Sequence, residues 1–242
     1  MLRDMRTRFG RTFFGYVIMV MWPLTHLLLL MTIYSLVRRA VAIGTSAPVF
    51  FGTGILPYIL CLYPARMTMM SLMQNAPLLY FPIVKSFDVI VARGVLETIT
   101  VFWVTVIFCL ILYILGVDIV PIHSEDALLA IFATVYLAFS IGFIAAVLYK
   151  LTRAWAAVQI GLLILMYFTS GAFFMPTSMP QVVQDVIWYN PLLHSVEWLR
   201  SAYYDGYGYG MLSRSYLIGF ATALLFIGLL SERLVRGFLL EK

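Results

Sequence analysis

Six long apolar stretches, separated by short polar segments, constrain the fold of this chain more than any other feature. A helix rises about 1.5 Å per residue and the hydrocarbon core of a bilayer is about 30 Å thick, so one crossing needs about 20 mainly apolar residues. Only 11% of the 242 residues are charged, whereas a soluble domain carries about 25%. The sequence therefore predicts one all-α integral membrane domain over residues 1–242. Its six transmembrane helices are expected at about 15–37, 49–70, 94–115, 127–149, 154–174 and 216–235.

Residues 1–14 are predicted to form an amphipathic helix that lies in the membrane interface. Its apolar face carries Leu2, Met5, Phe9 and Phe13, while Arg3, Asp4, Arg6, Arg8 and Arg11 occupy the other face and its edge. Such a helix could anchor the chain to the cytosolic leaflet or form a positively charged gate for an anionic substrate. Both interpretations stay open.

The distribution of Lys and Arg predicts the orientation of the chain. These residues are more frequent in the N-terminal helix, the 74–93 loop, the turn at Lys150 and the C-terminal tail than in the loops between them. Arg38 and Arg39 are the exception to this pattern. The positive-inside rule therefore places both termini in the cytosol. Because the basic residues lie at the ends of apolar runs, they indicate topology, and we expect no nucleic-acid partner.

Several kinds of chemistry have no signature in this sequence. It lacks the Gly-x-x-x-x-Gly-Lys-Ser/Thr phosphate loop, so the chain is not expected to hydrolyse ATP. The cysteines Cys61 and Cys109 fit neither a disulfide framework nor a metal site. A membrane enzyme acting on lipid-linked sugars, with Glu97, His26 or His194 as acid or base, is an alternative. Because these groups have no paired spacing, we predict no catalytic, metal or cofactor site in this chain.

The segment 74–93 is too polar and too rich in proline to cross the membrane, yet it contains the apolar run Leu78-Leu79-Tyr80-Phe81. An apolar patch on a cytosolic loop is typical of a surface that binds a protein partner. Packing of the loop against its own helices is the alternative. The composition of the loop allows both.

The segment 175–213 interrupts the apolar pattern of the C-terminal half. Pro176 and Pro180 stop helix continuation, and the following residues are numerous enough for short helices that dip into the membrane and return. Its tryptophan and tyrosine residues suit a membrane interface. Aromatic rings also stack on sugar faces, so a route for a glycan is the second interpretation. We predict re-entrant helices between spans five and six.

Two motifs carry a resemblance that covers essentially the whole chain. The first is the run Pro77-Leu78-Leu79-Tyr80-Phe81-Pro82-Ile83-Val84 leading to Asp88, Arg93 and Glu97, and the second is Tyr189-Asn190-Pro191-Leu192 followed by Glu197 and Arg200. With the basic N-terminus and the six spans, they resemble the ABC-2-type permeases. More narrowly, the chain resembles the capsular-polysaccharide export permeases of the inner membrane of Gram-negative bacteria.

This resemblance implies a homodimer of permeases on a dimer of separate ABC ATPase subunits, which would hold the ATP and Mg. The substrate would be a lipid-linked acidic polysaccharide, exported from cytosol to periplasm, with a periplasmic co-polymerase and an outer-membrane exporter as further partners. An ABC-2 permease for another glycan, a lipid or a drug is the alternative. Membrane lipid surrounds the chain in either case.

The resemblance, together with the charge and aromatic character of the residues themselves, gives four groups of candidate residues. The residues expected to couple the chain to the ATPase are Asn75, Pro77, Leu78, Leu79, Tyr80, Phe81 and Pro82. The basic residues expected to attract a polyanion are Arg6, Arg8, Arg11, Arg66 and Arg93. The aromatic residues expected along the substrate path are Tyr16, Trp22, Tyr167, Phe168, Phe173 and Phe174. A periplasmic gate motif comprises Asn190, Pro191, Glu197 and Arg200.

Overall fold

The computed structural model describes residues 14–37, 43–44, 46–81, 83–207 and 210–240. All regular structure in these residues is helical. The order is α2 (Phe14–Val37), α3 (Ala47–Met69), α4 (Ser71–Gln74), η1 (Ala76–Tyr80), α5 (Ser86–Ile114), α6 (Ser124–Leu151), α7 (Trp155–Phe168), η2 (Pro176–Ser178), α8 (Gln181–Ile187), α9 (Pro191–Tyr203) and α10 (Arg214–Leu240). The predicted all-α class is confirmed for the described part of the chain. The interfacial helix predicted for residues 1–14 lies almost entirely outside it.

Five helices, α2, α3, α5, α6 and α10, are long and apolar enough to cross a membrane. They correspond to predicted spans one to four and six, so the multi-pass membrane class is confirmed. The predicted fifth span, 154–174, is a continuous helix only from Trp155 to Phe168, which is 14 residues. At 1.5 Å per residue this helix is about 21 Å long and shorter than the hydrocarbon core. The described residues therefore contain five candidate full-length spans, and the sixth span stays a prediction.

The early end of α7 has two causes. Asn190 Nδ2 donates to the carbonyl oxygen of Met166 at 2.7 Å and to Thr169 Oγ1 at 2.8 Å, so a side chain from another element binds the last turn. Gly171 then adopts a φ of +76°, and a Cβ atom at this position would lie 2.7 Å from Pro176 Cγ. This turn favours glycine and excludes continuation of the helix.

The third span begins earlier than predicted. The backbone N–H of Lys85 donates to Asp88 Oδ2 at 3.0 Å, and this capping contact starts α5 at Ser86 instead of residue 94. The second half of the predicted 74–93 loop is consequently helical. The segment that links α4 to α5 runs from Asn75 to Lys85 and includes η1.

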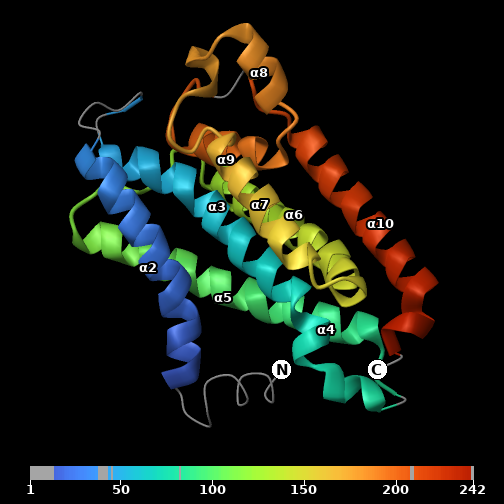
Figure 1. The fold of residues 1–242 in the computed structure, drawn as a ribbon. Helices are drawn as coiled ribbons and strands as arrows, with labels where there is room; N and C mark the ends of the chain where they lie inside the picture. Colours follow the sequence, from blue (N-terminus) through green and yellow to red (C-terminus); the bar gives the residue numbers. More distant parts are fainter. Residues whose placement is uncertain (1–13, 38–42, 45, 82, 208–209, 241–242) are drawn as a thin grey trace.

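The helices α3 and α6 form the centre of the bundle. The helix α6 packs against α3 and against α10, while α2 and α5 pack against α3 (Figure 1). Close approach of α3 and α6 depends on Gly142, where a Cβ atom would lie 2.7 Å from Thr68 Cβ and 2.9 Å from the Ala65 carbonyl oxygen. Small residues at helix contacts are typical of membrane bundles.

The predicted segment 175–213 contains the short helices η2, α8 and α9. The helices α8 and α4 lie at opposite ends of the molecule (Figure 1). The helix α9 packs against α3, α6 and α10, and all its residues from Pro191 to Arg200 are buried. Short helices in this segment are thus confirmed, and their re-entry into the membrane stays a prediction.

Candidate functional site

The side chain of Arg200 joins α9 to the turn that follows α7. Its guanidinium donates to the carbonyl oxygens of Gly171 at 2.6 Å, Ala172 at 2.8 Å and Phe174 at 3.3 Å. The guanidinium carbon also lies 4.2 Å from the centroid of the Phe50 ring. Arg200 is completely buried. Its charge is stabilised by backbone dipoles and one aromatic face.

Asn190 is the N-cap of α9. Its Oδ1 accepts from the N–H of Leu192 at 2.9 Å, while its Nδ2 donates to the last turn of α7. Pro191 occupies the first helical position, where a missing N–H costs nothing. Asn190 and Arg200 therefore attach both ends of α9 to the segment from Met166 to Phe174.

Glu197 lies on the same helix and is also buried. The hydroxyl of Tyr207 donates to Glu197 Oε1 at 2.7 Å, and Arg200 Nη1 lies 3.9 Å from that oxygen. Burial raises the pKa of the Glu197 carboxyl, and the Tyr207 hydrogen bond and the Arg200 charge act in the opposite direction. The predicted gate residues are thus brought together around one helix. Their role as a gate stays a prediction.

His194 is held by hydrogen bonds at both ring nitrogens. The N–H of Ser213 donates to Nδ1 at 3.1 Å, so Nε2 must carry the proton and donates to the carbonyl oxygen of Trp188 at 2.8 Å. Burial lowers the pKa of His194, which keeps the ring neutral. His26 and Glu97 lie on α2 and α5. His26 Nδ1 lies 3.0 Å from the hydroxyl of Tyr63, which lines the same pocket as Glu97, whereas the hydrogen-bond partners of His194 are Trp188 and Ser213.

The predicted aromatic path residues do not form one group in the structure. Tyr167 and Phe173 are buried in a cluster in which Tyr167 stacks on Tyr58 at 3.7 Å between centroids, and Phe173 lies 4.1 Å from Tyr34. Phe168 is exposed next to this cluster. The remaining members are Tyr16 and Phe174, both half-buried, and the exposed Trp22. Phe173 would contact a transported chain only if its neighbours moved apart.

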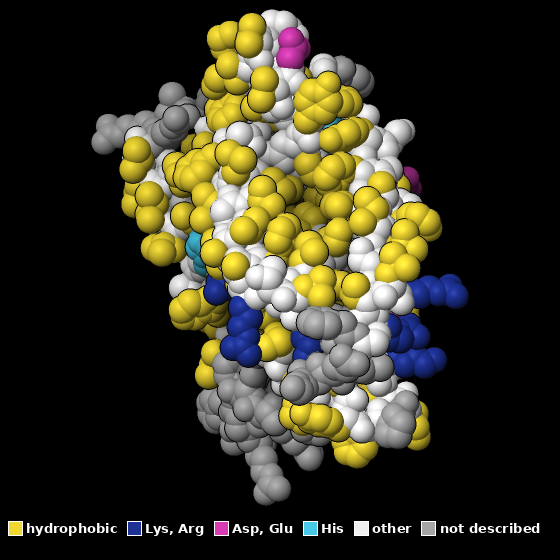
Figure 2. Space-filling model, turned by 45° about the vertical axis from the view of Figure 1, so that its right-hand side comes forward, with side chains coloured by type: hydrophobic (Ala, Val, Ile, Leu, Met, Phe, Trp, Pro, Cys, Tyr) yellow, Lys and Arg dark blue, Asp and Glu magenta, His cyan; other side chains and the backbone are white. Residues whose placement is uncertain are grey.

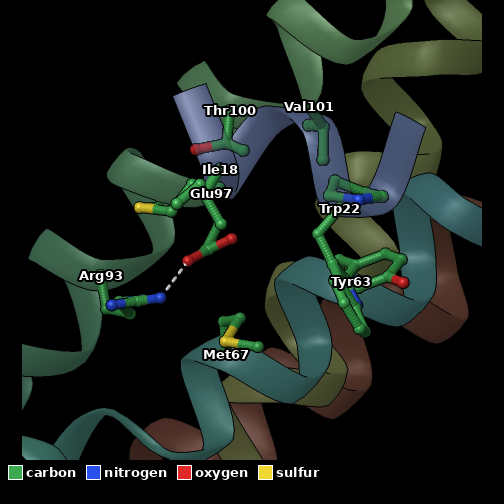
Figure 3. A pocket seen from close by; sticks show the side chains of 10 residues that line it. Ile18, Trp22, Tyr63, Met67, Arg93, Glu97, Thr100 and Val101 are labelled. Atoms are coloured by element: carbon green, nitrogen blue, oxygen red, sulfur yellow. Dashed lines mark ion pairs between the residues drawn. The ribbon is translucent and has the colours of Figure 1, made fainter. Parts of the chain in front are cut away.

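A pocket of about 330 Å³ lies between α2, α3 and α5, and Trp22 and Arg93 both line it (Figure 3). Arg93 pairs with Glu97 one turn further along α5, and both side chains are buried at the pocket wall. Trp22 from α2 and Tyr63 from α3 form the opposite side (Figure 3). The sequence placed Arg93 in an open loop. The structure instead places it inside the bundle, so it is no free basic residue of the entrance.

Of the other predicted basic residues, the structure describes only Arg66. Arg66 is exposed in the last turn of α3. Arg6, Arg8 and Arg11 lie outside the described residues. Figure 2 shows Lys and Arg side chains gathered towards the end of the molecule that contains α4, below a broad hydrophobic belt. This separation of charge from apolar surface agrees with helices that end at a membrane interface.

The predicted coupling residues divide between interior and surface. Asn75 is buried and donates to the Ser71 carbonyl oxygen at 3.1 Å, and Leu79 packs against the hydrophobic cluster that includes Leu72 and Ile90. Tyr80 is 76% exposed and Phe81 57% exposed. Pro77 is exposed and Leu78 half-buried, and Pro82 lies outside the described residues. Packing of the loop against its own helices therefore applies to Asn75 and Leu79, and partner binding by the exposed side chains stays a prediction.

Sequence reasoning missed Glu232, a second buried carboxylate within a predicted span. Its carboxylate accepts a hydrogen bond from Ser86 Oγ. It also accepts two from Arg236, from Nε at 3.1 Å and from Nη2 at 3.0 Å. Because Ser86 is the first residue of α5, this contact ties the C-terminal third of α10 to the start of α5. The i,i+4 spacing of Glu232 and Arg236 was the available signal.

Replacing Glu232 with alanine is expected to lower the free energy of unfolding by about 1–3 kcal/mol, because the Ser86 hydroxyl stays buried without its acceptor. Thermal unfolding of the purified protein in detergent would measure the change. The matched control is Asp185→Ala, which removes an exposed carboxylate on α8. Equal unfolding temperatures for Glu232→Ala and the unmodified protein would contradict a structural role for this contact.

Comparison with known protein families matches residues 1–204 to the ABC-2 type transporter family. The chain belongs to this family. The resemblance inferred from the sequence is therefore confirmed, and this ABC-2 family member is a transport subunit and no enzyme. The match covers the elements up to α9, including both motifs, and ends before α10 and Glu232.

Three relatives are similar over most of their length. The polysialic acid transport protein KpsM of Escherichia coli is 31% identical over 228 residues, which cover 94% of this chain and 88% of KpsM. The capsule polysaccharide export inner-membrane protein BexB of Haemophilus influenzae is 24% identical, and the alignment covers 95% of this chain and 86% of BexB. The capsule polysaccharide export inner-membrane protein CtrC of Neisseria meningitidis serogroup B is 23% identical, and the alignment covers 84% of this chain and 77% of CtrC.

Proposed function

We propose that this chain is the permease subunit of an ATP-driven transporter that exports a lipid-linked acidic capsular polysaccharide from the cytosol to the periplasm. The observation that carries the proposal is the similarity to KpsM over 94% of the chain. BexB and CtrC, which are named for capsule polysaccharide export at the inner membrane, support the same substrate class and location. The protein would accordingly reside in the bacterial inner membrane.

Energy for transport would come from a separate ABC ATPase subunit, which binds the ATP and Mg, because the sequence lacks a phosphate-binding loop. Two copies of this chain would assemble with two ATPase subunits. Tyr80 and Phe81 are the proposed contact, since both are exposed next to the helix α5 that they would move. Aromatic side chains dominate the binding energy of many interfaces.

The proposed orientation places α4, η1 and both termini in the cytosol. Lys85 precedes α5, Lys150 lies in the last turn of α6 and Arg153 lies in the turn before α7, so basic residues mark one end of three helices. The helices α8 and α9 would then face the periplasm. There they would close the path and meet the periplasmic co-polymerase, which leads to the outer-membrane exporter.

The proposed gate would move as a unit with the turn after α7. Arg200 and Asn190 bind both ends of α9 to residues 166–174, so separating α9 from this turn would break several buried hydrogen bonds. A displacement that carries both elements together avoids that cost. Such a movement would also expose Phe173 to a transported chain.

Expression of this chain in a capsule-forming bacterium that lacks its own permease tests the proposal. We expect polysaccharide to return to the cell surface and an ABC ATPase to co-purify with the chain in mild detergent. Cells without a permease should accumulate the polymer in the cytosol. Surface export without any associated ATPase, or no effect on an acidic capsule alongside transport of a neutral glycan, a lipid or a drug, would contradict the proposal.

A further inference from the structure

A groove of about 480 Å³ runs between α7 and α10, with α6 as its floor. Both helices pack against α6. Leu148 and Ala145 form part of the floor, Leu162 lies on the α7 wall, and Phe220 and Leu224 lie on the α10 wall. Figure 2 shows this face of the molecule, with a hollow lined by hydrophobic side chains in its middle. The hollow lies within the hydrophobic belt, so the groove opens towards the membrane.

The outer end of the groove is closed by protein, and basic residues lie near its inner end. Tyr189 and Asn190, which precede α9, and Pro191, its first residue, line the outer end. At the inner end, marked by the lining residues Leu148 and Trp155, Lys150 lies in the last turn of α6 and Arg153 lies in the turn before α7, beside the groove and not in its lining. An occupant that enters from the inner end therefore meets positive charge first and apolar surface next.

Two polar groups lie just inside this basic turn. Gln159 lines the groove and is almost fully buried; its Nε2 donates to the Ala65 carbonyl oxygen at 3.3 Å. Its Oε1 and the indole N–H of Trp155 are shielded from water, and neither has a hydrogen-bond partner among the described residues. Trp155 and Gln159 are four residues apart on one helix, so they share a face. An unpaired indole N–H at this depth favours a ligand that carries an oxygen atom there, whereas Gln159 Oε1 can only accept a hydrogen bond.

We propose that this groove binds one anionic phospholipid. Its phosphate would lie against Lys150 and Arg153, its glycerol ester oxygens beside Trp155, and one acyl chain along α6 between α7 and α10. This order of charge, ester oxygen and hydrocarbon matches the order of basic, polar and apolar groups along the groove. A transmembrane helix is about 10 Å across with its side chains, and the groove is too small to receive one. The lipid would hold α7, the shortest of the apolar membrane helices, in place.

The first test compares two lipids with identical acyl chains. Purified protein in neutral detergent is titrated with phosphatidylglycerol or with phosphatidylcholine, and binding is measured by native mass spectrometry and by the rise in unfolding temperature. A basic residue near the surface contributes a factor of about five to the binding of an anionic lipid. We expect Lys150→Gln with Arg153→Gln to weaken phosphatidylglycerol binding about 25-fold. The control Arg233→Gln, which alters an exposed basic residue on α10, should not change it.

The second test addresses the acyl chain. Leu162→Trp places a large ring in the groove and should reduce binding of both lipids, whereas Leu110→Trp, on the exposed surface of α5, should leave it unchanged. A photoactivatable phosphatidylglycerol should label residues 141–169 and 220–224. Equal affinity for the two lipids, unchanged binding by Leu162→Trp, labelling confined to other helices, or a cross-linked second polypeptide in the groove would each overturn the proposal. None of these readouts depends on which substrate is exported.

Discussion

Replacing Arg200 with alanine is expected to lower the free energy of unfolding by about 3–5 kcal/mol, the cost typical of removing one member of a buried charged network. Three backbone carbonyl oxygens, of Gly171, Ala172 and Phe174, lose their donor. Glu197 loses the only positive charge near its carboxyl among the described contacts. Unfolding of the detergent-solubilised protein, followed by tryptophan fluorescence, would measure the loss. The amount of monodisperse protein after gel filtration would report it independently.

Two further variants separate the guanidinium geometry from charge alone. Arg200→Lys keeps the charge but cannot bond two carbonyl groups in one plane, so we expect an intermediate loss. Arg214→Ala removes the partner of Asp126 on the surface, where a salt bridge contributes about 0–1 kcal/mol. Similar stability of Arg200→Ala and Arg214→Ala would show that the buried contacts do not hold α9 in place.

The apolar pattern predicts a membrane helix well where the length of the apolar run alone determines the helix. Each of α2, α3, α5, α6 and α10 overlaps its predicted span. The exception is α7, whose end is fixed by Asn190, a residue more than twenty positions away. Contacts of this kind leave no mark in local hydropathy, because an asparagine in a loop is equally compatible with a solvated position. Tertiary contact thus determines where this helix stops.

The contacts of the candidate residues also divide into those that the sequence can predict and those that it cannot. The motif containing Asn190 and Arg200 identifies a segment that the structure places around one buried helix. The partners of Arg200 are backbone carbonyl groups, which every residue has, so no sequence pattern could predict them. Arg93 is different, because its pairing with Glu97 follows from i,i+4 spacing on a helix. Extending α5 back to Ser86 in the sequence would have predicted that pair.

The double substitution Tyr80→Ser with Phe81→Ser is expected to abolish export while leaving the permease folded. Both side chains are exposed, and exposed positions usually change stability by no more than about 0.5 kcal/mol. At an interface, however, truncating aromatic anchors costs about 2 kcal/mol or more, which is at least a 30-fold loss of affinity. Co-purification of the ATPase and polysaccharide at the cell surface would be measured together.

The control for this prediction is Leu115→Ser, which removes a similarly exposed apolar side chain from the segment between α5 and α6. We expect it to retain export and ATPase binding. If the Tyr80 and Phe81 variant kept its ATPase but lost export, the segment would transmit movement without supplying affinity. If it kept both, the exposed end of η1 would have no part in coupling, and the contact with the ATPase would have to lie elsewhere on the cytosolic surface. The two readouts together therefore distinguish docking from transmission, which a growth or capsule assay alone could not do.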